Sequence, residues 1–188
     1  MRIIAGSAGG RRLAAPPEGT RPTTDRVREA LFSTLDTHVR EHSGGWAGIR
    51  FLDLFAGSGA VGLEAMSRGA EESTLVERDR RCLEVLRRNV ATVDGRARVV
   101  AADATKWRPE GGPYDVVYVD PPYALADEDV RGVLAGLVEH GAVADDALAV
   151  VERSVRSQAP WPPAGWEELR KREYGDTALW YGHVSRSA

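Results

Sequence analysis

The chain contains 188 residues with a formal net charge of −3, and its 43% hydrophobic and 28% charged residues are typical of one globular domain rather than a fibre or a disordered chain. The single cysteine, Cys82, excludes an intrachain disulfide and a cysteine-cluster zinc site, the four scattered histidines predict no metal site, and no apolar stretch approaches the roughly 20 residues of a membrane span. We therefore expect a cytoplasmic, monomeric protein with one active site and with neither a metal nor a membrane partner.

Basic residues are concentrated at the N-terminus, whereas the remainder of the chain is acidic. Among residues 1–28 only Glu18 and Asp25 are acidic, against the arginines Arg2, Arg11, Arg12, Arg21, Arg26 and Arg28. A local patch of this kind can contact nucleic-acid phosphates even in a protein of negative net charge. The alternative is that an arginine-rich composition places these residues on the surface without a partner.

The same N-terminal region is expected to form a small extension of the main domain. Residues 2–6 and 11–15 are short extended segments around a turn at 7–10 that is rich in glycine, which predicts a β-hairpin. We assign the hairpin extension to residues 1–22 and one compact domain to residues 23–188.

The following pattern predicts a parallel sheet covered by helices. Thr23 or Thr24 can cap a helix whose apolar residues repeat at helical spacing as far as Val39. Strands and helices then alternate, which is the signature of βα units. The expected elements are strand 50–55, helix 60–69, strand 73–77, helix 79–93, strand 97–102, strand 114–119, helix 127–140, strand 147–152 and an antiparallel hairpin of strands 166–174 and 177–184.

A glycine-rich loop follows the first strand of this sheet. Gly57, Gly59 and Gly62 satisfy the G-x-G-x-x-G pattern, and Glu77 ends the next strand. An acid at this position can hold a ribose diol. The pattern is equally compatible with NAD and with S-adenosylmethionine, and for Glu77 the alternative is a surface acid at a strand end.

A second informative loop, Asp120-Pro121-Pro122-Tyr123, follows the strand at 114–119. The carboxylate accepts hydrogen bonds, the two prolines present their carbonyls outward in a nearly preset geometry, and the tyrosine offers a stacking face. These groups suit an amino group on a planar base. The alternative is an ordinary turn, since Asp followed by Pro is a common chain reversal.

Taken in order, residues 52–59, Glu77, Asp103 and residues 120–123 resemble the motifs of class I S-adenosylmethionine-dependent methyltransferases that act on exocyclic amines. The N-terminal residues 2–13 and 21–32 resemble the signature of the RsmD family, which methylates the N2 amine of a guanine in small-subunit ribosomal RNA. The resemblance implies an α/β, Rossmann-like fold with a mostly parallel seven-stranded sheet, a C-terminal antiparallel hairpin and an N-terminal β-hairpin. It also implies S-adenosylmethionine as cofactor and 16S rRNA as partner, free or within a ribosomal subunit.

Residue roles follow from this resemblance by position. The implied cofactor-binding residues are Asp53, Phe55, Ala56, Gly57, Ser58, Gly59, Glu77, Arg78, Asp103 and Ala104. The implied catalytic residues are Asp120, Pro121, Pro122 and Tyr123, and the implied RNA-binding residues are Arg2, Arg11, Arg12, Arg21 and Arg26. In this scheme Asp120 and the Pro121 carbonyl accept the two N–H groups of the amine, and Asp103 meets the adenine edge. For Asp103 the alternative is a helix N-cap.

Four other functions stay open at this point. An NAD-dependent oxidoreductase fits the glycine spacing, although no hydride-transfer site is evident in the sequence. A DNA adenine or cytosine methyltransferase shares the Asp-Pro-Pro-Tyr loop but usually carries a target-recognition region for which this chain has little room. A protein glutamine methyltransferase usually has Asn where this chain has Asp120. A non-catalytic RNA-binding module would be expected to lose this loop.

Overall fold

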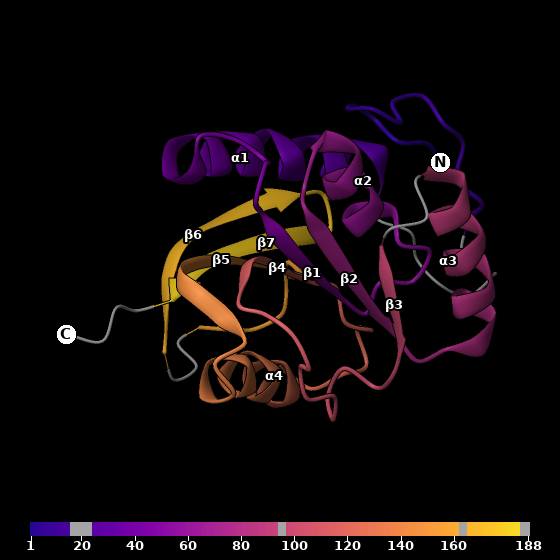
Figure 1. The fold of residues 1–188 in the computed structure, drawn as a ribbon. Helices are drawn as coiled ribbons and strands as arrows, with labels where there is room; N and C mark the ends of the chain where they lie inside the picture. The colour runs from indigo at the N-terminus through magenta and orange to yellow at the C-terminus, as the bar shows by residue number, and fades with distance from the viewer. Residues whose placement is uncertain (16–23, 94–96, 162–164, 185–188) are drawn as a thin grey trace.

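The computed structural model describes residues 1–15, 24–93, 97–161 and 165–184, and its centre is one seven-stranded sheet of order β3-β2-β1-β4-β5-β7-β6 (Figure 1). Strands β3, β2, β1, β4 and β5 run parallel, whereas β7 is antiparallel to both of its neighbours. The elements are α1 (Asp25–Ser43), β1 (Arg50–Leu54), α2 (Ala60–Arg68), β2 (Glu72–Glu77), α3 (Arg80–Val93), β3 (Arg98–Ala101), β4 (Tyr114–Val119), α4 (Asp127–Glu139), β5 (Val143–Ser154), β6 (Trp166–Tyr174) and β7 (Thr177–Val184).

The central strands of the sheet are buried on both faces, as expected for parallel strands connected by helices, whereas most residues of the edge strand β6 are exposed. In Figure 1, α1 and α2 cover one face and α4 covers the other, while α3 lies at the β3 edge. Alternate residues of β4 show the two layers: Val116 and Tyr118 pack with α1, and Val117 and Val119 pack with α4. The near-continuous apolar runs in the sequence are explained by this two-sided burial.

The ends of α1 follow from its sequence. Thr24 is the N-cap, and its hydroxyl accepts a hydrogen bond from the Val27 N–H at 3.3 Å. Asp25 lies in the first turn, where a carboxylate interacts favourably with the helix dipole. Gly44 ends the helix in the left-handed conformation, with φ of 73°. Of the two threonines predicted as caps, Thr24 takes the role, and Thr23 lies outside the described residues.

The predicted N-terminal β-hairpin is present but short. Arg2 and Arg12 form an isolated antiparallel bridge, and the Ile3 N–H donates to the Arg11 carbonyl at 3.0 Å. The N–H groups of Ile4 and Ala5 donate to the carboxylate of Glu64 on α2, at 2.7 and 3.0 Å. The segment is therefore attached to the body of the domain.

The sheet topology positions the site. β1 lies between β2 and β4, so the connections from the carboxyl end of β1 and from that of β4 lead toward opposite edges of the sheet. In open α/β sheets such a switch point is where ligands bind. The glycine loop follows β1 and the Asp-Pro-Pro-Tyr loop follows β4, so the two loops that the sequence analysis singled out lie at this point.

Candidate active site

Glycine is needed at the three positions of the loop after β1 for different structural reasons. A Cβ on Gly59 would lie 2.3 Å from Cδ1 of Leu86, and one on Gly62 would lie 2.1 Å from Cδ2 of Leu75. Gly57, by contrast, has φ of 56° and no heavy atom within 4 Å of such a Cβ. Gly59 and Gly62 therefore permit close packing of α2, whereas Gly57 leaves room beside the backbone for a ligand.

Asp53 on β1 connects the strand to the helix that follows the loop. It is 2% exposed, and its Oδ2 accepts a hydrogen bond from the Gly62 N–H at 2.9 Å. Burial raises the pKa of Asp53 to about 7, the hydrogen bond from Gly62 opposes this change, and the charge of Glu77 adds to it. The Asp53 carboxyl therefore ties the end of β1 to the start of α2 across the glycine loop.

Phe55 adopts a backbone conformation that is unusual for its residue type. Its φ is 63°, in the left-handed region, which costs a residue with a side chain about 1–3 kcal/mol. The next residue ties the loop to the neighbouring strand, since the Ala56 N–H donates to the Val76 carbonyl at 2.9 Å. The turn out of β1 is therefore sharp and held in place, which opens space above the strand end.

Glu77 is more than a surface acid at a strand end. Its Oε2 accepts a hydrogen bond from the Gly57 N–H at 2.8 Å, and its Oε1 accepts from the N–H groups of Arg78 and Asp79 at 2.7 Å each. The carboxylate thus joins the end of β2 to the glycine loop, and it also lines the cavity described below.

Asp103 forms a turn and an ion pair. Its Oδ1 accepts hydrogen bonds from the hydroxyl and the N–H of Thr105, at 2.8 and 3.1 Å, and its Oδ2 accepts from Arg78 at 2.9 Å. The hydrogen bonds from Thr105 and the Arg78 guanidinium lower the pKa of Asp103, although partial desolvation opposes them. Asp103 therefore caps a turn at residues 104–106 rather than the helix that the N-cap alternative expected, and its neighbours Ala102 and Ala104 line the cavity.

The Asp-Pro-Pro-Tyr loop brings an acid and an aromatic ring to the same place. The Asp120 N–H lies 3.4 Å from the Leu54 carbonyl, so the acid stands beside the end of β1. Tyr123 follows the two prolines and is 46% exposed. One expectation is corrected: the carbonyl of Pro122 does not point outward, because it accepts hydrogen bonds from the Leu125 N–H at 2.9 Å and from Arg153 at 3.3 Å.

Arg153 on β5 fixes the shape of this loop, and the sequence analysis missed it. Its side chain is buried, with a relative accessibility of 5%. Besides the Pro122 carbonyl it contacts the Leu125 carbonyl and Oδ1 of Asp127, both at 2.8 Å. One guanidinium therefore holds three points between the Asp-Pro-Pro-Tyr loop and the start of α4. An arginine at a strand end has no motif around it that could have identified this role.

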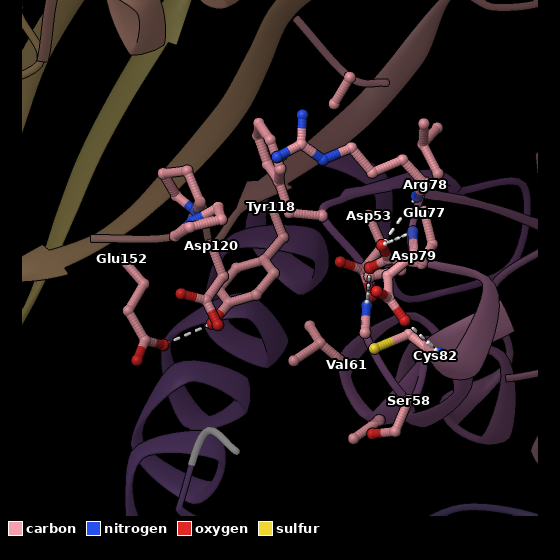
Figure 2. A pocket seen from close by; sticks show the side chains of 18 of the residues that line it. Asp53, Ser58, Val61, Glu77, Arg78, Asp79, Cys82, Tyr118, Asp120 and Glu152 are labelled. Atoms are coloured by element: carbon pink, nitrogen blue, oxygen red, sulfur yellow. Dashed lines mark hydrogen bonds between the residues drawn. The ribbon is translucent and has the colours of Figure 1, made fainter. Parts of the chain in front are cut away.

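These elements surround a cavity of about 470 Å³, a size typical of small-molecule sites (Figure 2). Every residue predicted to be catalytic or to bind the cofactor lines it, except Gly59 and Asp103. Figure 2 shows Tyr118, Asp120 and Glu152 on one side and Glu77, Arg78, Asp79 and Cys82 on the other. The two predicted loops thus form the walls of one pocket.

Other residues of the cavity were not predicted. Tyr118 and Glu152 line it beside Asp120, and Cys82 lines it beside Asp79. For Glu152 a signal existed, since it is an acid at the end of a predicted strand, as Glu77 is. Burial and the neighbouring carboxylates raise the pKa of the Cys82 thiol to about 11, so it stays protonated and is a poor nucleophile.

The described arginines predicted to bind RNA differ in their contacts. Arg2, Arg11, Arg12 and Arg26 are all exposed. Arg11 also donates to the carbonyls of Thr92 and Val93 at 2.6 and 3.0 Å, so its guanidinium caps the C-terminus of α3. Arg21 lies outside the described residues.

Neither a metal site nor a membrane span is found in the described part of the chain. Within residues 1–15, 24–93, 97–161 and 165–184, no group of at least three His, Cys, Asp or Glu side chains could hold a metal ion. In these same ranges no helix has the length and apolar character needed to cross a membrane.

Comparison with known proteins gives one family. The model of the family described as Conserved hypothetical protein 95 matches residues 1–183. The ribosomal RNA small subunit methyltransferase D of Escherichia coli K12 is 42% identical over 183 residues, which is 95% of this chain and 87% of that protein. A solved structure of a hypothetical protein from Thermus thermophilus is 35% identical, with a TM-score of 0.76, and the match covers 96% of this chain and 98% of that one.

The fold is also shared with a more distant protein. The RNA methyltransferase of Salinibacter ruber, solved in complex with S-adenosyl-L-homocysteine, is 16% identical, with a TM-score of 0.63 and coverage of 89% of this chain and 96% of that one. This likeness concerns the fold alone: the sheet and its helices have the arrangement of that methyltransferase.

Proposed function

The chain belongs to the RsmD family, described as conserved hypothetical protein 95, and from this premise we propose that it transfers the methyl group of S-adenosylmethionine to the N2 amine of a guanine in small-subunit (16S) rRNA. The observation that carries the proposal is the cavity in which the glycine loop after β1 faces the Asp-Pro-Pro-Tyr loop after β4. A methyl donor held by the first loop would lie beside an amine held by the second.

The cofactor side of the cavity fits a nucleoside with a charged tail. Gly57 leaves space next to the loop backbone, Glu77 offers a carboxylate at the end of β2, and Ala104 provides an apolar wall. We assign the ribose hydroxyls to Glu77, the adenine edge to Asp103 and Ala104, and the methionine part to residues 55–59. S-adenosylmethionine supplies an electrophilic methyl group on a sulfonium, so no metal is needed.

The substrate side of the cavity fits an exocyclic amine. Such an amine is a poor nucleophile because its lone pair is delocalised into the ring. Asp120 and the Pro121 carbonyl would accept its two N–H groups and favour the geometry in which the lone pair is available. The Asp120 carboxylate would also stabilise the positive charge that develops on nitrogen. Tyr123, which is 46% exposed, would stack on the base.

The exposed N-terminal arginines provide the RNA contact in this proposal. Arg2, Arg12 and Arg26 would contact phosphates, a contribution that is independent of sequence and weakens with salt. Arg11 is better explained by its contact with α3.

The proposal is tested by methyl transfer from S-adenosylmethionine with a tritiated methyl group. The protein is incubated in parallel with small ribosomal subunits from a strain that lacks the family member, with naked 16S rRNA, with large subunits and with double-stranded DNA. We expect label in small-subunit rRNA only, and the ratio between the first two substrates shows which assembly state is preferred. Label in DNA, or none in any substrate, contradicts the proposal.

A binding measurement distinguishes the proposed methyltransferase from the alternative of an NAD-dependent oxidoreductase. S-adenosylhomocysteine should raise the melting temperature of the protein in proportion to the logarithm of its concentration above Kd, whereas NAD should leave it unchanged. A shift with NAD alone would favour the oxidoreductase.

A further inference from the structure

A second acid stands beside Asp120 in the cavity. Glu152 lies in the buried part of β5 and is 6% exposed, yet it lines the cavity. Val119 pairs with Val151 in the parallel ladder, so Asp120 and Glu152 are the next residues of two adjacent strands. Neighbouring strands are about 4.8 Å apart, which allows two such side chains to reach one planar group.

Glu152 is held by a hydrogen bond from the same face of the sheet. The Tyr118 hydroxyl donates to Oε2 of Glu152 at 2.5 Å. Asp120 directly follows β4 and is two residues from Tyr118, so alternation along the strand brings their side chains to the same side of the sheet, and Figure 2 shows both beside Glu152. The tyrosine thus fixes where the second carboxylate lies.

A buried acid in this place needs an explanation. Burying a carboxylate is costly unless it is hydrogen-bonded, and an apolar residue of similar size would pack there without that cost. The cavity wall therefore presents two hydrogen-bond acceptors, from Asp120 and Glu152, at the ends of two adjacent strands. Such an arrangement suits a ligand that presents two donors side by side.

We propose that Glu152 selects guanine by accepting the hydrogen bond of its N1–H, while Asp120 accepts from the adjacent N2 amine; this rests on the proposed function. The Watson–Crick edge of guanine carries these two donors next to each other. Adenine and cytosine each place an acceptor, N1 or N3, beside their amine, and that acceptor would face the Glu152 carboxylate. Tyr118 is a positioning residue, because it acts through Glu152.

The inference predicts discrimination by the N1 proton. 2-Aminopurine keeps the amine at the same position but has an acceptor in place of N1–H. A site built to accept a hydrogen bond rejects an analogue that lacks the donor, because the polar group of the site is left unpaired. Glu152→Gln keeps the size of the side chain and offers an amide N–H, which can donate to that acceptor.

The experiment compares two substrates and four proteins. Small subunits are reconstituted with 16S rRNA in which the mapped target guanine is retained or replaced by 2-aminopurine, and kcat/KM is measured for wild type, E152Q, Y118F and E128Q. Glu128 is an exposed acid on α4, so E128Q is a matched carboxylate-to-amide control. Affinity for S-adenosylhomocysteine and the melting temperature are measured for each protein.

We expect E152Q to reduce the guanine to 2-aminopurine ratio of kcat/KM at least tenfold, and Y118F to reduce it less, with cofactor affinity within twofold of wild type. E128Q should match wild type. If the ratio is unchanged in E152Q, the inference is overturned, whether or not transfer to guanine is lowered. Loss of an acid with a purely structural role would lower kcat/KM equally for both substrates. If the wild-type protein does not methylate subunits that retain the target guanine, the proposed function itself is contradicted. This outcome can be distinguished from failure of the inference about Glu152.

Discussion

The cavity and the N-terminal segment are built in different ways. At the cavity, the glycine loop after β1 is held by contacts between residues that are close in sequence or lie on adjacent strands. Examples are the hydrogen bonds from Gly62 to Asp53 and from Gly57 to Glu77. The N-terminal segment is held by residues far along the chain: Ile4 and Ala5 contact Glu64, and Arg11 contacts Thr92. A strand-loop-helix unit can be predicted from its own residues, whereas the docking of a segment on distant helices cannot.

This difference separates two kinds of charged residue. Asp120 lines the cavity, and in the proposed mechanism its carboxylate binds the reacting amine. Its replacement should therefore reduce methyl transfer. Arg11 lies in a patch that looks like an RNA-binding surface in the sequence, yet its guanidinium serves the fold. Both Arg11 and Arg12 are exposed, but the Arg11 guanidinium caps α3, so we divide the patch into a structural residue, Arg11, and residues such as Arg12 that we propose to contact RNA. Variants of each kind can test the division.

The largest expected effect is at the Asp-Pro-Pro-Tyr loop. Asp120→Ala should reduce methyl transfer to rRNA about 10³-fold or more, because in the proposed mechanism the carboxylate both orients the amine and stabilises its developing charge. The affinity for S-adenosylhomocysteine, measured by calorimetry, should stay within a few-fold of wild type. Near-normal turnover in this variant would remove Asp120 from the mechanism.

A smaller effect on methyl transfer is expected at Arg153, which holds the Asp-Pro-Pro-Tyr loop. Arg153→Met removes the donor that holds the Pro122 and Leu125 carbonyls and Asp127. It should lower kcat about tenfold or more through misplacement of the loop, and it should also lower the melting temperature, since Asp127 loses its partner. Arg153→Lys keeps the charge and should recover part of kcat. If R153M changes only the melting temperature, Arg153 stabilises the fold without positioning the loop.

Variants of two N-terminal arginines should differ in which measurement they change, RNA binding or thermal stability. Arg12→Glu should weaken binding to small-subunit rRNA and reduce the salt dependence of log K by about one, with little change in melting temperature. Arg11→Glu should lower the melting temperature, because the carbonyls of Thr92 and Val93 would face a carboxylate. Binding isotherms at several salt concentrations and thermal unfolding give both values. Equal behaviour of the two variants would show that the segment is one undivided basic patch.

The smallest expected effect concerns pH. Because burial raises the pKa of Asp53 from 3.8 to about 7, the folded protein keeps a proton that the unfolded chain has lost between these values. The stability that this proton contributes is therefore complete below pH 3.8 and is lost as pH rises through 7. Between pH 5 and 8, roughly, the free energy of unfolding should fall more steeply for wild type than for Asp53→Asn. Parallel urea titrations of the two proteins check this, and identical slopes would contradict it.

Most of the fold and of the cavity could be predicted, because local patterns specify them. Alternating strand and helix signals gave the parallel sheet, and Gly57 and Asp120 identified the two loops that meet at the switch point. The separate reasons for Gly59 and Gly62 could not be predicted, since they depend on Leu86 and Leu75 from other elements.

The remaining misses also have physical reasons. Arg153 and Tyr118 act through contacts across strands, which no spacing along the chain reveals. The outward orientation expected for the Pro122 carbonyl was wrong, because the loop folds back on itself through Leu125. The attachment of the N-terminal hairpin to α2 was also missed, because the Glu64 carboxylate that accepts from the Ile4 and Ala5 N–H groups lies far along the chain.

The central claim is that this cavity methylates the N2 amine of guanine in small-subunit rRNA. The direct measurement is mass spectrometry of nucleosides from small subunits of a strain that lacks the family member, after incubation with the protein and S-adenosylmethionine carrying a trideuterated methyl group. The account predicts deuterated N2-methylguanosine as the sole labelled nucleoside, at one position of the rRNA. Label on adenosine or cytidine, or on another atom of guanosine, would contradict it.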